Sequence, residues 1–327
     1  MPAEVETMFY NTEVPWHGLG KKVDNYLTSE EAIKAAGLDW TVDPVNLFHN
    51  FQGNRIMVEG KVGLRRNTDG RILSVLSPEY KPVQNAEAFE FFDSVVGTKS
   101  AIYDTAGSLR NGQKIWILAK VTGAISVKGD QVDKYIVLMN SHDGTVALKM
   151  FFTPVRVVCM NTLNAAEAGA ARIETFYAKH TGNIATRMER AREILGMTNK
   201  FYEEFAEQAN RLANAQLPPA QLPKLLATAF GTTGAIRPED VVNFSDFGTT
   251  RRINEMEKIY ELFGGSGKGL DIPNIRGTKW AAYNAIVEYI DYAKQFRGKQ
   301  PEDNRLEYAW IKSMNIKHRA WNYLLKD

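Results

Sequence analysis

The sequence predicts an α+β fold, in which an antiparallel, hairpin-rich sheet with packed helices precedes a helical C-terminal half. Two observations lead to this prediction. Extended apolar runs in the first half are separated by Asp-Gly and Asn-Gly pairs, which favour hairpins. The second half instead repeats apolar residues at steps of three and four, as amphipathic helices do. With 327 residues, 44% of them hydrophobic, the chain can form one large domain or two smaller ones.

The first predicted elements are a hairpin and a helix. The stretch 54–77 contains two extended runs around the turn signal Asp69-Gly70. The stretch 85–97 begins with Asn85 as a candidate helix cap. It places one apolar face on a helix, formed by Ala88, Phe91, Phe92 and Val95.

Two further hairpins follow. Residues 101–121 contain two strands joined around Asn111-Gly112. Residues 134–140 and 145–152 flank the letters S-H-D-G, and Asp143-Gly144 suits a turn because glycine adopts positive φ at little cost. After the last strand, Pro154 can open a helix capped by Thr153, so a buried helix is predicted over 154–170.

The second half is predicted to be helical. A heptad seam runs from Ile184 to Leu212, and it packs either on the protein's own core, which we favour, or on a neighbouring subunit. The letters LPPAQLP then interrupt the helix. Further helices are expected at Gln221–Phe230, Thr250–Phe263, Thr278–Phe296 and Asn304–Leu325. The chain therefore divides near residue 180, into an α+β core at 1–180 and a helical region at 181–327.

Few residues carry a catalytic or metal-binding pattern. Cys159 is the single cysteine and lies in an apolar stretch, which excludes cysteine-cluster metal sites and an internal disulfide. The five histidines show no ligand spacing, and GGSGKG at 264–269 lacks the spacing of a phosphate-binding P-loop. The pair Glu288 and Asp291 is interpreted as solvated helix surface. We therefore expect no catalytic residue, no metal ion and no cofactor, and the chain is more consistent with a non-enzymatic protein.

A small-ligand pocket is the alternative that the sequence leaves open. Trp16 and His17 lie in the compact motif PWHGLG, where the tryptophan either stacks on a ligand or anchors the N-terminal arm. His142 and Asp143 lie at a predicted hairpin tip, and loops on rigid scaffolds often carry function. These four residues are secondary ligand candidates.

Basic and aromatic residues interleave in the strand region, although the net charge is only +2. If they share one sheet face, they form a groove that holds a phosphate backbone and stacks bases; ordinary alternation of a polar sheet face is the other interpretation. The predicted phosphate contacts are Arg65, Arg66, Lys81, Arg110, Lys114, Lys149 and Arg156, and the predicted stacking residues are Tyr80 and Trp116. Arg71 and Lys120 belong to the same interleaved pattern.

Five strings carry a resemblance to a known family: PWHGLG (15–20), YKPVQNAEAFEFFD (80–93), TAGSLRNGQKIWILAKV (105–121), NSHDGTVALKMFFTPVRVVCMNTL (140–163) and TKWAAYNAIVEYIDY (278–292). They resemble the phage- and plasmid-related family known as domain of unknown function 932. One departure is Tyr292, where the family pattern usually has His. The hairpins followed by a helix are also similar, at the level of the fold, to single-strand annealing proteins of the RecT, Red-beta and Rad type. The resemblance implies a role in DNA replication or recombination.

The expected function is therefore binding and annealing of single-stranded DNA without ATP, by a homo-oligomeric ring or filament. The apolar runs are too short to span a membrane and the start MPAEVETMFY lacks a signal peptide, so a cytoplasmic protein is expected. Two alternatives stay open. One is an enzyme or small-ligand binder that uses His17, His142 and Asp143, and the other is a phage-encoded interaction protein that uses the heptad helix.

Overall fold

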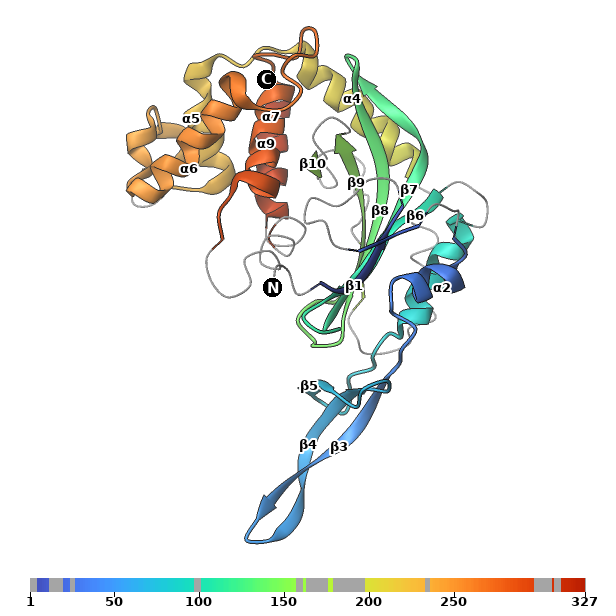
Figure 1. Ribbon diagram of the computed structural model, residues 1–327. Helices are drawn as coiled ribbons and strands as arrows, with labels where there is room; N and C mark the ends of the chain where they lie inside the picture. Colours follow the sequence, from blue (N-terminus) through green and yellow to red (C-terminus); the bar gives the residue numbers. More distant parts are fainter. Residues whose placement is uncertain are drawn as a thin grey trace. The chain divides into compact units, whose positions relative to one another are not determined.

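The computed structural model describes residues 5–11, 20–23, 27–96, 101–156, 161–162, 176–178, 198–232, 236–296, 308 and 313–326, and it confirms the α+β class (Figure 1). The chain divides into two compact units. Unit 1 comprises Met1–Thr122, Tyr135–Phe151 and Thr175–Gly196. Unit 2 comprises Gly123–Lys134, Phe152–Glu174 and Met197–Asp327. The boundary predicted near residue 180 falls among residues 179–197, outside the described residues, and stays a prediction.

The main sheet is largely antiparallel, in the order β10-β9-β8-β7-β6-β1-β2, with β11 also paired to β9. The strands β1 and β2 form a parallel pair, whereas β1 and β6 are antiparallel. The bounds of the strands are β1 Val5–Tyr10, β2 Lys21–Lys22, β6 Ala101–Leu109, β7 Lys114–Val127, β8 Asp130–Ser141, β9 Leu148–Arg156, β10 Asn161–Thr162 and β11 Phe176–Ala178.

The predicted hairpins are confirmed, and their turns have the backbone that the sequence signals require. Between β6 and β7, Asn111 and Gly112 both have positive φ. Between β8 and β9, Gly144 has φ 71° and the carboxylate of Asp143 accepts hydrogen bonds from the backbone N–H and hydroxyl of Thr145. The letters S-H-D-G therefore form the bend between two strands.

A second, three-stranded sheet has the order β3-β4-β5, with β3 at Val42–Phe51, β4 at Asn54–Arg66 and β5 at Ile72–Leu76. The predicted hairpin around Asp69-Gly70 is its β4–β5 pair. Strand β3 was not predicted from the sequence. It joins β4 through Gln52 and Gly53, both at positive φ, as a tight two-residue turn requires. In Figure 1 the distal half of the β3–β4 hairpin extends away from the other elements of unit 1. We call this hairpin the arm.

Two helices complete the described part of unit 1. Helix α1 (Ser29–Ala35) begins with a capping box, in which Thr28 and Glu31 satisfy each other's backbone N–H groups. Helix α2 (Asn85–Val96) confirms the predicted helix. Its Phe89 and Phe92 pack against Tyr103 of β6, with ring centroids 5.7 Å and 6.1 Å apart. The apolar face of α2 therefore covers the main sheet beside β6.

The helix predicted over 154–170 is wrong where the structure describes it. Thr153 and Pro154 lie buried inside strand β9, which ends at Arg156, and Asn161–Thr162 form strand β10. Aromatic and β-branched residues in MFFTPVR favour continuation of the strand, and proline is tolerated in a strand where its missing N–H is not needed by the ladder. The rest of that stretch, including Cys159, lies outside the described residues.

The second half of the chain is helical where the structure describes it, as predicted. Its described helices are α4 Thr198–Asn214, α5 Leu222–Phe230, α6 Thr250–Glu261, α7 Lys279–Glu288 and α9 Met314–Leu325. Short 3₁₀ turns are η1 Pro219–Gln221, η2 Pro238–Asp240 and η3 Phe244–Phe247, while η4 Leu262–Ser266 and η5 Tyr289–Ala293 are π-helical turns. In the part of the chain that the structure describes, no helix is long and apolar enough to cross a membrane.

The described part of the heptad seam packs inside unit 2. The helix α4 buries Tyr202, Phe205, Ala209 and Leu212. The ring of Phe205 stacks on Trp321 of α9 at 5.4 Å and meets the edge of Trp280 of α7 at 6.3 Å. This half of the seam therefore belongs to the core of its own unit, and residues 179–197 lie outside the described residues.

Candidate nucleic-acid interface

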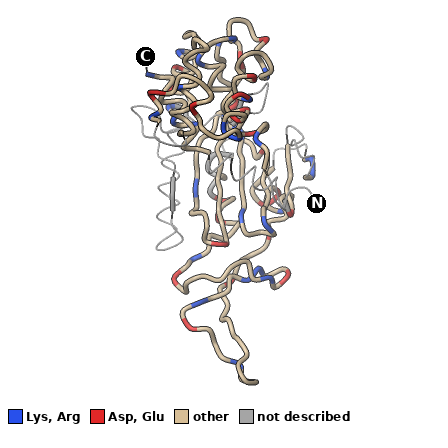
Figure 2. Tube along the Cα trace, turned by 90° about the vertical axis from the view of Figure 1, so that its left-hand side faces the viewer, with Lys and Arg blue, Asp and Glu red and all other residues tan. Residues whose placement is uncertain are grey.

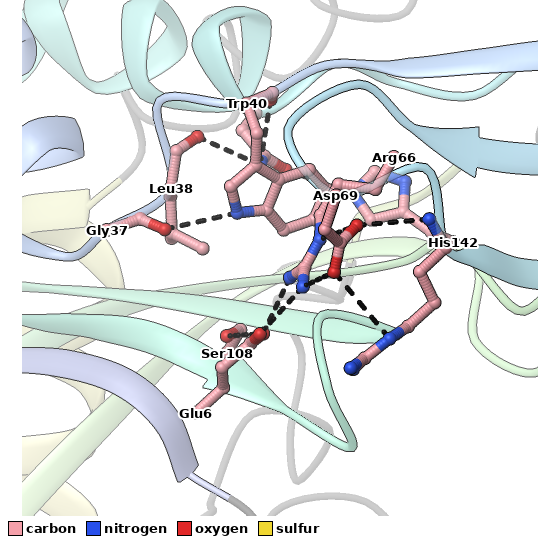
Figure 3. A network of polar contacts seen from close by, with 10 residues as sticks. Glu6, Gly37, Leu38, Trp40, Arg66, Asp69, Ser108 and His142 are labelled. Atoms are coloured by element: carbon pink, nitrogen blue, oxygen red, sulfur yellow. Dashed lines mark hydrogen bonds and ion pairs between the residues drawn. The ribbon is translucent and has the colours of Figure 1, made fainter.

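We call the end of the arm where Val42 begins β3 and Arg66 ends β4 the arm base. The arm base is joined to the main sheet through Arg66. Its guanidinium donates two hydrogen bonds of 2.8 Å to the carboxylate of Glu6 on β1, and its Nε donates to Asp69 at 3.0 Å (Figure 3). The side chain of Arg66 is only 7% exposed. The guanidinium holds the pKa of Asp69 well below its usual range, since it donates hydrogen bonds to the ionised carboxylate. Arg66 therefore forms buried structural ion pairs with Glu6 and Asp69.

A second set of contacts at the arm base includes His142. The imidazole is fully buried, lies edge-on to Trp40 at 5.3 Å and contacts the side-chain oxygen of Asn85 through Nε2 at 3.0 Å. The amide of Asn85 donates in turn to the carbonyls of Leu38 and Trp40. The ring of Trp40 also lies 5.4 Å from the guanidinium carbon of Arg66, and Figure 3 labels all three residues. This histidine connects the β8–β9 bend, helix α2 and the start of the arm.

Three further hydrogen bonds link strand β5 and the chain after it to the main sheet. The hydroxyl of Ser74 donates to the carbonyl of His142, and the hydroxyl of Tyr80 donates to the carbonyl of Ser141, both at 2.7 Å. The amide of Gln113 donates to the carbonyl of Leu73. Burial raises the pKa of Tyr80 far above its usual value. The arm base is thus held by charged, aromatic and backbone contacts together.

The structure buries several residues that were predicted to bind phosphates or stack bases. Lys114 and Lys149 are each 3% exposed. Trp116 is 5% exposed and covers its register partner Gly107, where an added Cβ would lie 2.6 Å from the indole. A phosphate contact from Arg66, Lys114 or Lys149, or base stacking by Trp116, is therefore inconsistent with this conformation. These four residues therefore cannot line the groove that was expected across the sheet face, because their side chains are buried in the interior.

The other predicted contacts are distributed differently. Lys81 is exposed, and Arg65 is half exposed beside Asp43 at 3.9 Å. Arg110 is half-buried in the β6–β7 turn, Tyr80 uses its hydroxyl as described above, and the side chain of Arg156 lies outside the described residues. Arg65 and Lys81 therefore remain available to solvent among the predicted cations.

The small-ligand candidates do not form a described pocket. Trp16 and His17 lie outside the described residues. His142 is buried in the arm base, whereas Asp143 is half exposed in its turn. In the ranges that the structure describes, no group of three or more His, Cys, Asp or Glu residues could hold a metal ion.

The distal arm carries a feature that the sequence analysis missed. We call residues 46–58 the arm tip. Four of its large apolar side chains are exposed, namely Phe48 44%, Phe51 56%, Ile56 41% and Met57 48%, whereas Leu47 and Val58 are half-buried. The guanidinium of Arg55 lies 3.9 Å above the ring of Phe48. Exposed apolar side chains gathered in one place commonly mark an interaction surface.

The composition of the arm tip suits a ligand that carries both negative charges and aromatic rings. Its sequence, NLFHNFQGNRIMV, contains Arg55 and His49 but no acidic residue, although the whole chain has 38. Figure 2 shows positive and negative residues interspersed over the rest of the described chain. Asn46, Asn50, Gln52 and Asn54 add amides, which can hydrogen-bond base edges. The sequence signal for the arm tip was the alternation of apolar and polar residues over 45–51, followed by the turn residues Gln52-Gly53.

The acidic pair of the helical unit is buried, so the interpretation of Glu288 and Asp291 as solvated surface is wrong. Asp291 accepts a hydrogen bond of 2.7 Å from Lys317 of α9, which is fully buried. Glu288 accepts from the backbone N–H of Lys268, in the GGSGKG loop. Burial lowers the pKa of Lys317. These carboxylates hold a loop and a neighbouring helix within unit 2.

Comparisons with known proteins add a family but no activity. The model of a family described as domain of unknown function (DUF932) matches residues 72–310. UPF0380 protein YfjQ of Escherichia coli (strain K12) is 34% identical over 95 residues, which cover 28% of this chain and 31% of that protein. No solved structure matches the chain. The family match begins at β5, so the β3–β4 arm precedes it.

Proposed function

We propose, for a chain that belongs to the family described as domain of unknown function (DUF932), that its function is to bind single-stranded nucleic acid through the arm tip. The protein acts as a binding and annealing factor, with no nucleotide hydrolysis. Single-stranded DNA is the favoured ligand, as the resemblance to phage and plasmid proteins implies. Exposed Arg65 and Lys81 extend the contact beyond the tip.

The observation that carries the proposal is the pair of exposed rings Phe48 and Phe51 in an acid-free segment, with the guanidinium of Arg55 over the Phe48 ring. Every base has an apolar face, so aromatic side chains bind single strands with little sequence preference. A nearby guanidinium contributes attraction to phosphates and displaces counterions. Each of these side chains is exposed, which leaves it able to reach bases or phosphates.

The buried arm base supports the same function. Hydrogen bonds from Arg66, Ser74, Tyr80 and Gln113 hold the base of the arm and the adjoining strand β5 against the main sheet. A tip on a held base loses less conformational freedom on binding than a tip on a free loop. Annealing then requires several copies, in the homo-oligomer that we expect, to present one strand to its complement.

A protein partner is the second candidate function, because exposed apolar side chains also bind other proteins. The absence of acidic residues and the four amides of the arm tip favour nucleic acid. An enzyme that uses His142 and Asp143 has less support, since the imidazole is buried in the arm base.

The test is fluorescence anisotropy with an unstructured, labelled oligothymidylate over a range of salt concentrations. Replacing Phe48 and Phe51 together with alanine is expected to weaken binding about fivefold to a hundredfold, the usual worth of one base–aromatic stack, because their cross-strand pairing puts the two rings on opposite faces of the ribbon and one strand lies along one face. Replacing Arg55 with alanine is expected to reduce the slope of log K against log salt by about 0.7, the share of one single-strand phosphate.

Two exposed residues of unit 2 serve as matched controls. The side chain of Arg251 is 82% exposed and Val242 is 68% exposed. Alanine at either position should leave affinity unchanged. The proposal fails if the unmodified protein does not bind single strands at low salt, or if the arm-tip variants bind as tightly as these controls.

A further inference from the structure

The arm tip presents apolar side chains on both of its faces. Residues that pair directly across an antiparallel ladder lie on the same face, and neighbours along a strand lie on opposite faces. The pairs Phe48↔Met57 and Asn50↔Arg55 therefore form one face, and the position of Arg55 over the Phe48 ring agrees. The pairs His49↔Ile56 and Phe51↔Asn54 form the other face. Each face carries one exposed phenylalanine and one exposed aliphatic side chain.

A ligand that lies along one side of the ribbon would use only one of these faces. Single-stranded DNA bound in that way leaves the second phenylalanine in water. Burial of both faces requires a ligand that surrounds the tip, with aromatic surfaces on each side. The acid-free composition, with Arg55 and His49, favours bases and phosphates as those surfaces.

The thickness of the ribbon limits where the bases can lie. A sheet with side chains on both faces occupies about 10 Å, whereas successive nucleotides of stacked DNA are about 3.4 Å apart. The whole tip is therefore too thick to enter between two stacked bases of an intact duplex. It fits where two strands diverge, with one strand on each face.

We propose that the arm tip is a wedge for the junction between duplex and single-stranded DNA, with Phe48 stacking on one strand and Phe51 on the other. This inference rests on the proposed nucleic-acid function and specifies its substrate class. In annealing, such a junction is the growing end of the new duplex. The wedge would hold the two strands apart there, ahead of the last base pair formed.

The experiment compares the binding of a forked oligonucleotide with that of a single strand of the same length. Both carry 2-aminopurine at the same position, which in the fork is the junction. The unmodified protein is expected to bind the fork about five- to tenfold more tightly, the worth of one additional stack at the lower end of the usual range. Fluorescence of 2-aminopurine at the junction should change on binding, whereas the same probe deep in the duplex should not respond.

Single and double variants distinguish the wedge from one-sided binding. Either Phe48→Ala or Phe51→Ala should abolish the preference for the fork, and the double variant should lose no more of that preference. Val75→Ala is the matched control, because Val75 is 51% exposed on β5 outside the tip. Equal binding of fork and single strand would overturn the wedge while leaving the proposed function intact. No binding to either DNA would overturn both, and capture of a protein through the tip would identify the alternative.

Discussion

Replacing Arg66 with methionine is expected to lower the free energy of unfolding of unit 1 by about 3 kcal/mol. The guanidinium donates two hydrogen bonds to Glu6 and is 7% exposed, so the pair lies near the buried limit, where breaking one partner costs about 3–5 kcal/mol. The carboxylate of Glu6 is 26% exposed, which allows water to compensate part of the loss and places the expectation at the lower end. Methionine keeps much of the apolar volume of the arginine stem without its charge.

The assay is native-state hydrogen exchange, read for the peptides that contain β1 and β4, together with urea unfolding. A double-mutant cycle with Glu6→Gln should give a coupling energy of about 1–3 kcal/mol, because the double variant removes both charges of the Arg66–Glu6 pair while Asp69 keeps Arg71, whose Nε lies 3.6 Å from its carboxylate. A coupling energy under about 0.5 kcal/mol would refute the assignment of Arg66 as a buried structural pair and would restore it as a candidate phosphate contact.

Three other outcomes are expected. Arg66 and the backbone N–H of Arg71 hold the pKa of Asp69 below its ordinary value. The stability that this carboxylate contributes is therefore complete near neutral pH and is lost as the pH falls through roughly 5 to 2. The urea midpoint of Asp69→Asn should lack that acid-dependent component. Replacing Phe205 with alanine should lower the stability of unit 2 by about 3–5 kcal/mol, since its ring packs between Trp280 and Trp321, and unchanged hydrogen exchange in α7 and α9 would contradict this packing. Replacing Asp291 with alanine should destabilise unit 2 by about 3–5 kcal/mol because buried Lys317 loses its partner, and Asp291→Ala combined with Lys317→Met should recover most of the loss in thermal unfolding.

Local sequence signals predicted the elements that depend on local interactions. Asp69-Gly70, Asn111-Gly112 and Asp143-Gly144 each marked a turn, because the positive φ of the glycine is a property of the turn itself. The apolar period of α2 likewise predicted the helix and the buried residues Ala88 and Phe92, although not the buried Phe89. Pro154 misled for the same reason: a proline opens helices and interrupts strands by default, but the aromatic strand around it continues to Arg156.

The candidate site could be predicted only in part. Interleaved cations were visible in the sequence, yet burial separated Arg66, Lys114 and Lys149 from the exposed Arg65 and Lys81. Alternation along a strand shows that two faces exist but not which face the rest of the chain covers. The arm tip was missed because its phenylalanines have the pattern of a buried strand, and only the structure shows them exposed.

The fold class, the turns and the helical character of the second half were predictable from the sequence, since each depends on residues close together in the chain. The roles of the charged and aromatic side chains depend instead on long-range packing. Arg66 meets Glu6 across 60 positions, and His142 meets Asn85 across 57. Contacts between such distant residues depend on the packing of the whole sheet, which removed these two from a candidate interface and left Phe48 and Phe51 in solvent.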